Sequence, residues 1–167
     1  LVHFQQGNYT EALKYFEESL QLGLQRGDHR GIAARNGNIG LVYIQQGKFD
    51  LAKQHLEKAL KIDEKTGNLN GRSIRLKHLG DLYKAQDDPK KALDFYRSSY
   101  KILQKLGDLR QIGSILIEIS ILHTKIGDFS KGMMNIQQAI KYLKITEDKE
   151  LLSDAESTLA LIKSNLH

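Results

Sequence analysis

The side chains that most often carry out chemistry in proteins are present in this sequence, but their spacing does not assemble a reactive site. The six His residues stand at positions 3, 29, 55, 78, 123 and 167, and no two are four residues apart, the spacing that places two metal ligands on one helix face. We therefore expect no metal site. Because the sequence contains no Cys, it offers neither a thiolate nucleophile nor a disulfide.

Two further patterns could suggest phosphate binding or carboxylate catalysis, and neither has the required context. The segment 31–37 begins and ends with Gly but lacks the Lys-Ser/Thr pair and the preceding strand of a phosphate-binding loop. The neighbouring carboxylates Glu17 and Glu18 point in different directions on a helix, so they cannot face each other across a substrate. No Ser stands in a nucleophile-elbow pattern. The sequence therefore predicts a protein that is not an enzyme and needs no cofactor.

The elements that position these residues follow a repeat of 40 residues. One set of turn signals recurs at that step: Gly7-Asn8-Tyr9, Gly47-Lys48-Phe49, Asp87-Asp88-Pro89 and Gly127-Asp128-Phe129. A second set lies halfway between them: Gly27-Asp28, Gly67-Asn68, Gly107-Asp108 and, degenerate, Glu147-Asp148. Gly favours the left-handed conformation that ends a helix, and Asp or Asn can cap the next one. We therefore expect a turn every 20 residues.

The segments between the turns have the pattern of helices. Apolar residues such as Leu13, Phe16 and Leu20 recur at helical spacing. Pro89 follows Asp88, as at the first position of a helix behind its cap. The pattern predicts helices at 9–26, 29–46, 49–66, 69–86, 89–106, 109–126, 129–146 and 149–164, preceded by a helix at 1–6 that contains Phe4 and Gln5.

Small residues at fixed positions indicate how the helices pair. Gly40 and Gly80 stand three residues before Tyr43 and Tyr83, and Ala occupies the matching position of most second helices. Small residues let two helices approach closely, while the aromatic ring fills the space beside them. This pattern predicts antiparallel helix hairpins.

The first full unit of this pattern is Asn38–Tyr43 with Gly47, Ala52, Leu56 and Ala59, and the second is His78–Tyr83 with Ala92, Tyr96 and Ser99. The third unit has Ser120, His123 and Gly132 at the Gly, Tyr and Ala positions. These motifs resemble the tetratricopeptide repeat (TPR) family over the whole chain. The period exceeds the family's usual length of about 34 residues. In this it is similar to the repeats of Leu-Gly-Asn-type adaptors, kinesin light chains and bacterial regulatory TPR proteins.

The resemblance implies an all-α fold, a right-handed superhelical solenoid of antiparallel helix hairpins. We expect one repeat domain over residues 1–167, with a partial repeat at 1–32, full repeats at 33–72, 73–112 and 113–152, and a capping helix or partial repeat at 153–167. Because residue 1 is a Leu inside an expected helix, we interpret the chain as a fragment of a longer protein.

The resemblance also implies a concave groove, lined mainly by the first helix of each hairpin. Alignment to the family's ligand-facing positions predicts these partner-binding residues: Asn38, Leu41, Gln45, Lys77, His78, Asp81, Lys84, Glu118, Ile121 and Lys125. A wider set adds Ala34, Gly37, Ile44, Ala85, Ile117 and Thr124, with Phe4 and Gln5 from the helix expected at 1–6. The Asn and Gln amides could hold a peptide backbone, and the Lys residues could pair with carboxylates. The expected partner is a protein or peptide with acidic and apolar residues.

The charge and hydropathy of the sequence bear on other possible classes of function. The net charge is +5 and the pI is about 9.3, but charges of both signs are interspersed. An RNA-binding repeat is disfavoured because the equivalent positions hold Asn38, His78 and Glu118, and a carboxylate repels phosphate. No apolar run reaches the roughly 18 residues of a membrane span. We expect a cytoplasmic scaffold or adaptor, and the alternatives are a regulatory or sensory region of a larger signalling protein and a structural module that self-associates through its open ends.

Overall fold

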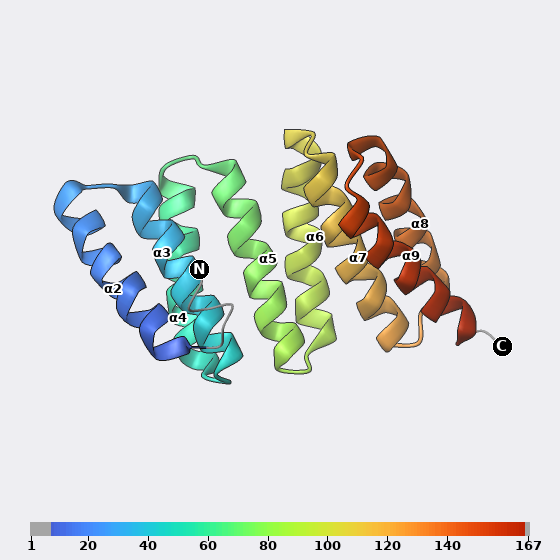
Figure 1. The fold of residues 1–167 in the computed structure, drawn as a ribbon, viewed down its shortest axis with the longest axis horizontal. Coiled ribbons are helices and arrows are strands. Elements are labelled where there is room, and N and C mark those ends of the chain that lie inside the picture. Colours follow the sequence, from blue (N-terminus) through green and yellow to red (C-terminus); the bar gives the residue numbers. More distant parts are fainter. Residues whose placement is uncertain (1–7, 166–167) are drawn as a thin grey trace. The chain divides into compact units, whose positions relative to one another are not determined.

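The computed structural model describes residues 8–165, and the described chain is helical with short turns (Figure 1). Eight helices lie within this range: α2 Tyr9–Arg26, α3 His29–Gln45, α4 Phe49–Lys65, α5 Leu69–Ala85, α6 Pro89–Leu106, α7 Leu109–Lys125, α8 Phe129–Thr146 and α9 Lys149–Ser164. Each predicted helix from 9–26 to 149–164 is therefore present, and its ends agree with the prediction to within one residue. The expected helix at 1–6, with Phe4 and Gln5, lies outside the described residues.

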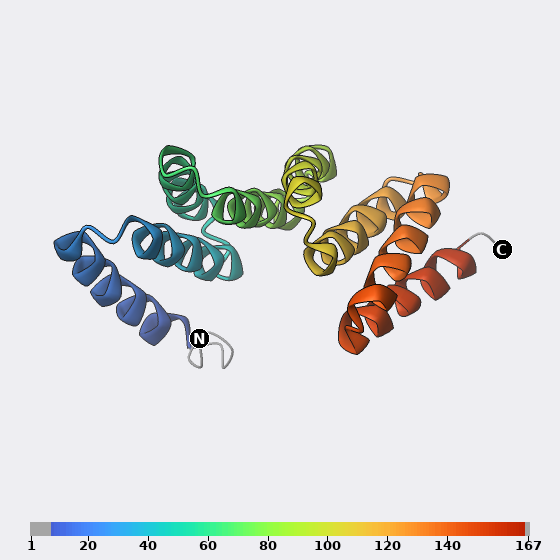
Figure 2. The same ribbon diagram turned by 90° about the horizontal axis from the view of Figure 1, so that it is seen from above.

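The helices form two compact units, residues 1–88 and residues 89–167. In the first unit, α3 packs against α2, α4 and α5. In the second unit, α7 packs in the same way against α6, α8 and α9. Figure 2 shows α3 and α5 side by side, with α4 packed against both. The single repeat domain expected over 1–167 stays a prediction.

The helix ends follow the turn chemistry of the sequence. Gly27 and its repeat equivalents adopt positive φ angles of 65 to 83°. The carboxylate of Asp28 then accepts a hydrogen bond of 2.9 Å from the Gly31 N–H, and the Asp or Asn caps of α5, α7, α8 and α9 accept a bond of the same kind. Lys48 occupies the cap position of α4 and has no acceptor to offer. Asp87 and Glu147 replace Gly at two helix ends and still take φ angles of 59° and 56°.

The hairpins depend on close contact at the small residues. A methyl group on Gly40 of α3 would lie 2.7 Å from Cγ of Leu56 on α4, so only Gly fits there. In the second unit Ser120 takes this position, and its hydroxyl donates a 2.7 Å hydrogen bond to the carbonyl oxygen of Gly132 on α8. Because the residue of α8 that faces Ser120 is a Gly, the two helices come close enough for the Ser120 hydroxyl to form this hydrogen bond.

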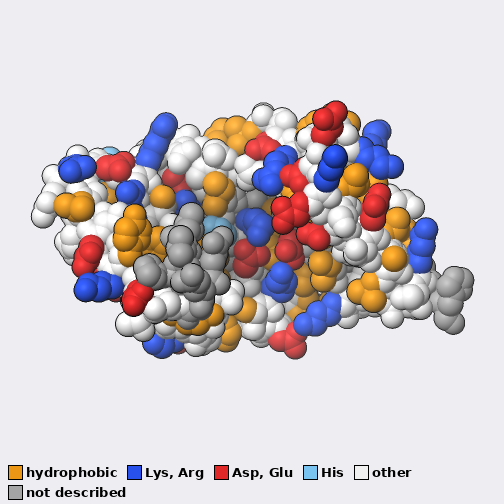
Figure 3. All heavy atoms as spheres, viewed as in Figure 1, with side chains coloured by type: hydrophobic (Ala, Val, Ile, Leu, Met, Phe, Trp, Pro, Cys, Tyr) orange, Lys and Arg blue, Asp and Glu red, His pale blue; other side chains and the backbone are white. Residues whose placement is uncertain are grey.

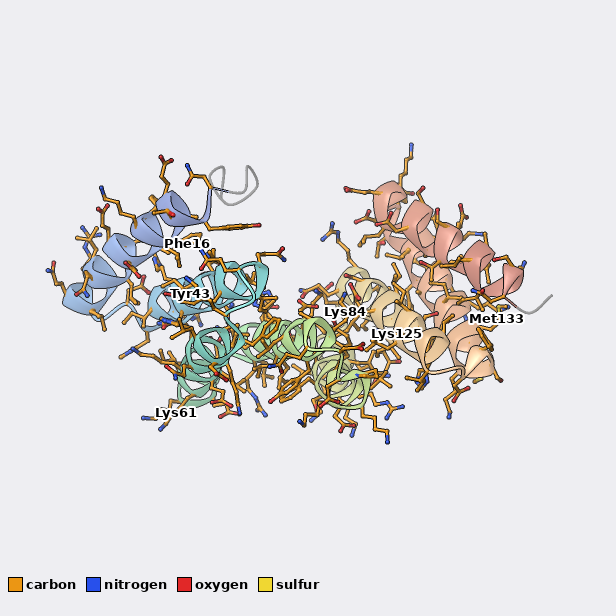
Figure 4. All side chains as sticks on the ribbon, turned by 90° about the horizontal axis from the view of Figure 1, so that it is seen from below. Phe16, Tyr43, Lys61, Lys84, Lys125 and Met133 are labelled. Carbon is orange, nitrogen blue, oxygen red and sulfur yellow. The ribbon has the colours of Figure 1, made fainter. Side chains whose placement is uncertain are left out.

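One cluster of the first unit's core lies between α2 and α3. Ala12, Phe16, Ile39 and Val42 are buried there, and Tyr43 packs against them. In Figure 4, Phe16 on α2 and Tyr43 on α3 lie beside each other. The aromatic residue of the repeat therefore fills the space that the sequence pattern assigns to it.

Basic and acidic side chains are interspersed on the face of the molecule shown in Figure 3, as the sequence indicates. In the part of the chain that the structure describes, no helix is long and apolar enough to cross a membrane.

Candidate partner-binding site

The predicted partner-binding residues of the first unit lie on two adjacent helices. Asn38, Leu41 and Gln45 come from α3, while Lys77, His78, Asp81 and Lys84 come from α5. These two helices are in contact, and each of the seven residues is at least partly exposed. We call these seven residues the α3/α5 face. The side chain of Asn38 is partly exposed, and no hydrogen bond joins its amide to another described residue.

A buried ion pair fixes α5 against α4 behind this face. Arg75 Nε lies 3.3 Å from Oδ2 of Asp63, and the two side chains are only 8% and 1% exposed. Oδ1 of Asp63 accepts a second hydrogen bond, of 2.7 Å, from the side chain of Asn68. The guanidinium of Arg75 also lies directly over the Cα of Gly37 on α3, where any Cβ would collide with it. One charged cluster thus joins all three helices.

Lys77 and Asp81 of the α3/α5 face neutralise each other. Their Nζ and Oδ2 atoms are 3.2 Å apart, at the i, i+4 spacing of a helix. A partner therefore meets an ion pair there rather than a single cation, which weakens the expectation that Lys77 alone selects a carboxylate.

His78 lies deeper than an exposed surface residue. Its Nδ1 atom is buried and has no hydrogen-bond partner. The pKa of His78 is lowered to about 4, chiefly by burial; the Asp81 carboxylate opposes this shift, and the positive charges of Arg75 and Lys77 contribute to it. The imidazole is therefore neutral at physiological pH, and it can contact a ligand only as an uncharged group.

The remaining predicted residues, Glu118, Ile121 and Lys125, lie on α7 of the second unit. Ile121 and Lys125 line a hollow of about 210 Å³ between α7 and α9, together with Thr124, Thr158, Leu161 and Ile162. Ile121 is 40% exposed and Leu161 is 61% exposed, so the hollow presents two large apolar side chains to solvent. We call it the α7/α9 hollow.

Leu161 was not among the predicted partner-binding residues, although the 40-residue period of the sequence indicates it. It stands 40 residues after Ile121, as Ile121 stands 40 after Asp81 and 80 after Leu41. Continuing the period through the last segment would have placed α9 as another first helix and Leu161 at a ligand-facing position.

All of the predicted partner-binding residues except Glu118 lie on the α3/α5 face or line the α7/α9 hollow. Several residues of the wider predicted set are not accessible to a partner. Gly37, Ile44 and Ile117 are buried in their units, so a partner cannot reach them. Among the described residues, no group of three His, Cys, Asp or Glu side chains is placed to hold a metal ion.

Comparison with known proteins identifies the repeat. A tetratricopeptide repeat family model matches residues 1–65 and again residues 32–105. No curated protein sequence gives a significant match.

Solved structures resemble the chain at low sequence identity. A signal transduction ATPase with numerous domains (STAND), which carries a tetratricopeptide repeat sensor, from Pyrococcus horikoshii aligns with a TM-score of 0.88 and 20% identity. The alignment covers 99% of this chain but only 25% of the ATPase. A putative kinesin light chain with nearly identical TPR-like repeats from Podosopora anserina aligns at 0.76 and 18% identity, covering 97% and 80% of the two chains. BtubC (BKLC) from P. vanneervenii aligns at 0.74 and 14% identity, covering 97% and 74%. These similarities confirm the expected all-α helical-repeat solenoid fold.

Proposed function

Because this chain belongs to the tetratricopeptide repeat family, we propose that it is a protein-interaction module that holds a peptide or partner protein on the exposed faces of its first helices. A helical-repeat fold supports a scaffold or sensor role in general, since its stacked helices present extended binding surfaces. In this proposal the partner binds at the α3/α5 face and the α7/α9 hollow, and the side chains of these two surfaces select it.

The α7/α9 hollow is the observation that carries this proposal. Its lining is almost entirely apolar, and Ile121 of α7 and Leu161 of α9 both line it with much of their surface in water. Adjacent exposed apolar side chains are a common feature of interaction sites. Lys125 stands at the edge of the same hollow, where it can meet a carboxylate.

The α3/α5 face supports the polar part of the proposed recognition. The amides of Asn38 and Gln45 can both donate and accept, as the backbone of an extended peptide requires. Lys84 adds a cation, and the net charge of +5 favours an acidic partner. The proposed partner is therefore a protein segment with acidic and apolar residues. Asp81 on α5 and Glu118 on α7 also occupy predicted partner-binding positions, and their carboxylates disfavour nucleic acid.

A selected peptide tests this proposal. We would select binders of the full chain from a random peptide display library and measure their affinity by calorimetry. The double variant Asn38→Ala with Lys84→Ala, or Ile121→Asp alone, should weaken binding at least tenfold while helicity is unchanged. Lys61→Ala is the control, because Lys61 projects from α4 on the side away from α3 (Figure 4). Equal affinity of all variants would show that the partner binds elsewhere.

A second candidate is a sensory or regulatory region of a larger signalling protein. The aligned STAND ATPase carries its repeats as a sensor, and this chain spans a quarter of that protein. The sequence of the full gene distinguishes the two candidates. A nucleotide-binding ATPase domain encoded beside the repeats would favour the sensor, and an isolated repeat region would favour an adaptor. The adaptor role and the cytoplasmic location are parts of the proposal.

Self-association is a third candidate, motivated by exposed apolar residues such as Leu161 on the last described helix. Light scattering over a concentration series decides it. A monomer at every concentration that still binds a selected peptide would rule it out.

A further inference from the structure

A second hollow lies in the residues 89–167 unit, away from the proposed partner-binding face. It measures about 430 Å³ and is formed between α6 and α8, with α7 as its floor. Leu116 and Ile119 of α7 supply an apolar floor, and Met134 of α8 is 67% exposed at its wall. None of its lining residues is shared with the α7/α9 hollow. We call it the α6/α8 hollow.

The α6/α8 hollow lies beside a position at which the third repeat differs from the first two repeats. The repeat position of Tyr43 and Tyr83 holds His123 here. In the first unit, the Tyr43 ring packs on the core between α2 and α3 and lies 5.6 Å from the ring of His55 on α4. His123 has a smaller ring at the same step of the repeat. In the second unit the side chain at this position, His123, lines the hollow between α6 and α8.

One end of the hollow carries an excess of positive charge. Arg97 Nη2 lies 3.4 Å from Nε2 of His123. A guanidinium only donates hydrogen bonds, so this ring nitrogen must accept and the imidazole is neutral. Lys131, the other cation of the lining, is paired at 2.6 Å with Asp128. The charge of Arg97 therefore has no carboxylate among the hollow's lining residues to balance it.

His123 also has an unused donor in this cluster. With Nε2 accepting from Arg97, the ring proton is on Nδ1, which is buried without a hydrogen-bond partner. The nearest carboxylate oxygen, Oδ2 of Asp128, is 3.8 Å from Nδ1, too far for a hydrogen bond. The side chain is 4% exposed. A buried donor without a partner is costly to keep, so the polar cluster of Arg97 and His123 is incompletely satisfied.

Polar groups surround the other end. Tyr100 of α6 and Gln138 of α8 line it, with Asn135 between them and the cationic end. These groups can orient a ligand by hydrogen bonds without adding charge. A volume of about 430 Å³ lies in the range of pockets that hold small organic molecules.

We propose that the α6/α8 hollow binds a small organic anion, a carboxylate on an apolar body, with the carboxylate at Arg97 and the body over Leu116 and Ile119. The inference is independent of the proposed partner-binding function, because it concerns a different surface and a different class of ligand. It would make the second unit responsive to a metabolite as well as to a protein.

The probe is 1-naphthoate, and 1-naphthamide is the uncharged molecule of the same shape. Both are titrated into the full chain labelled with ¹³C at the Met methyl groups, and the Met134 methyl reports occupancy. At about 0.3 kcal/mol per non-hydrogen atom, a ligand of this size binds with a Kd on the order of 1 mM. Naphthoate should bind at least tenfold more tightly than naphthamide.

Three variants test the residues assigned to the site. Arg97→Met should remove the preference for naphthoate and leave naphthamide binding unchanged. Lys101→Met, which removes an exposed charge from the same helix, is the matched control and should change neither. His123→Tyr restores the residue of the other repeats and should weaken both probes by filling the hollow.

The proposal is overturned if the two probes bind equally or if Arg97→Met behaves like Lys101→Met. It is also overturned if naphthoate binds while the Met134 methyl signal does not respond. Displacement of naphthoate by an acidic peptide of higher affinity would assign the hollow to a protein partner and likewise contradict it.

Discussion

The ion pair of Arg75 and Asp63 gives the most quantitative prediction for the first unit. Arg75→Met removes the cation but keeps most of the apolar length that packs against α3. Oδ1 of Asp63 keeps its 2.7 Å hydrogen bond from Asn68, while Oδ2 loses the donor at 3.3 Å. Because the carboxylate is only 1% exposed, water cannot replace that donor.

The expected cost follows from leaving one charge buried and unpaired. Breaking a buried ion pair typically costs about 3–5 kcal/mol, and the retained bond from Asn68 places this variant at the lower end, about 3 kcal/mol. The unfolding equilibrium constant of the unit should rise by about two orders of magnitude. Urea denaturation followed by circular dichroism at constant pH measures this change.

Two comparisons make the result decisive. Arg72→Met breaks a pair with Glu64 at 3.7 Å in which both side chains are well exposed, and it should cost less than about 1 kcal/mol. The double variant Asp63→Leu with Arg75→Met replaces both charges by apolar groups and should recover stability to within about 1 kcal/mol of the natural protein. The reasoning is refuted if Arg75→Met costs no more than Arg72→Met, or if the double variant is as unstable as Arg75→Met.

Three further predictions concern the backbone and pH. Gly37→Ala should destabilise the first unit by roughly 1–3 kcal/mol in thermal melts, because its methyl group collides with the Arg75 guanidinium. Gly23→Ala adds a methyl with only the Ile32 side chain close by at 3.3 Å, so it should be near neutral, and equal effects would contradict the packing. Glu147→Gly should stabilise the second unit by about 1 kcal/mol by relieving its φ of 56°, whereas Glu147→Ala should not. The pKa of His78 is about 4 in the folded chain and 6.5 when unfolded, so its contribution to stability is complete above pH 6.5 and is lost as pH falls toward 4. That loss amounts to about 3 kcal/mol, and an NMR titration midpoint of the His78 ring near pH 6.5 would refute it.

The helices and their ends were predictable because each boundary is set by local chemistry. A Gly with positive φ ends a helix and an Asp or Asn cap begins the next one, and both are recognisable from the local sequence without knowledge of tertiary contacts. The 40-residue period shows the same signals again in each repeat. The same 40-residue period extends to Leu161, so a ligand-facing residue was predictable at that position as well.

The properties of the predicted site residues were less accessible, because they depend on partners distant in sequence. His78 looks like an exposed polar residue in the pattern, and only the packing of α5 shows that its Nδ1 is buried. Gly37 was expected to face a ligand, whereas it gives space to Arg75. The pairing of Arg75 with Asp63 joins two helices, and no spacing rule within one helix predicts it.

Mapping a bound peptide by amide chemical shifts tests the central claim most directly. The ¹⁵N-labelled chain is titrated with the display-selected peptide, and shift changes are assigned along the sequence. The account predicts that the largest changes fall on first helices, at α3 with α5 or at α7 with α9, and include Asn38 or Ile121. Changes confined to the second helices α4, α6 and α8 would contradict it.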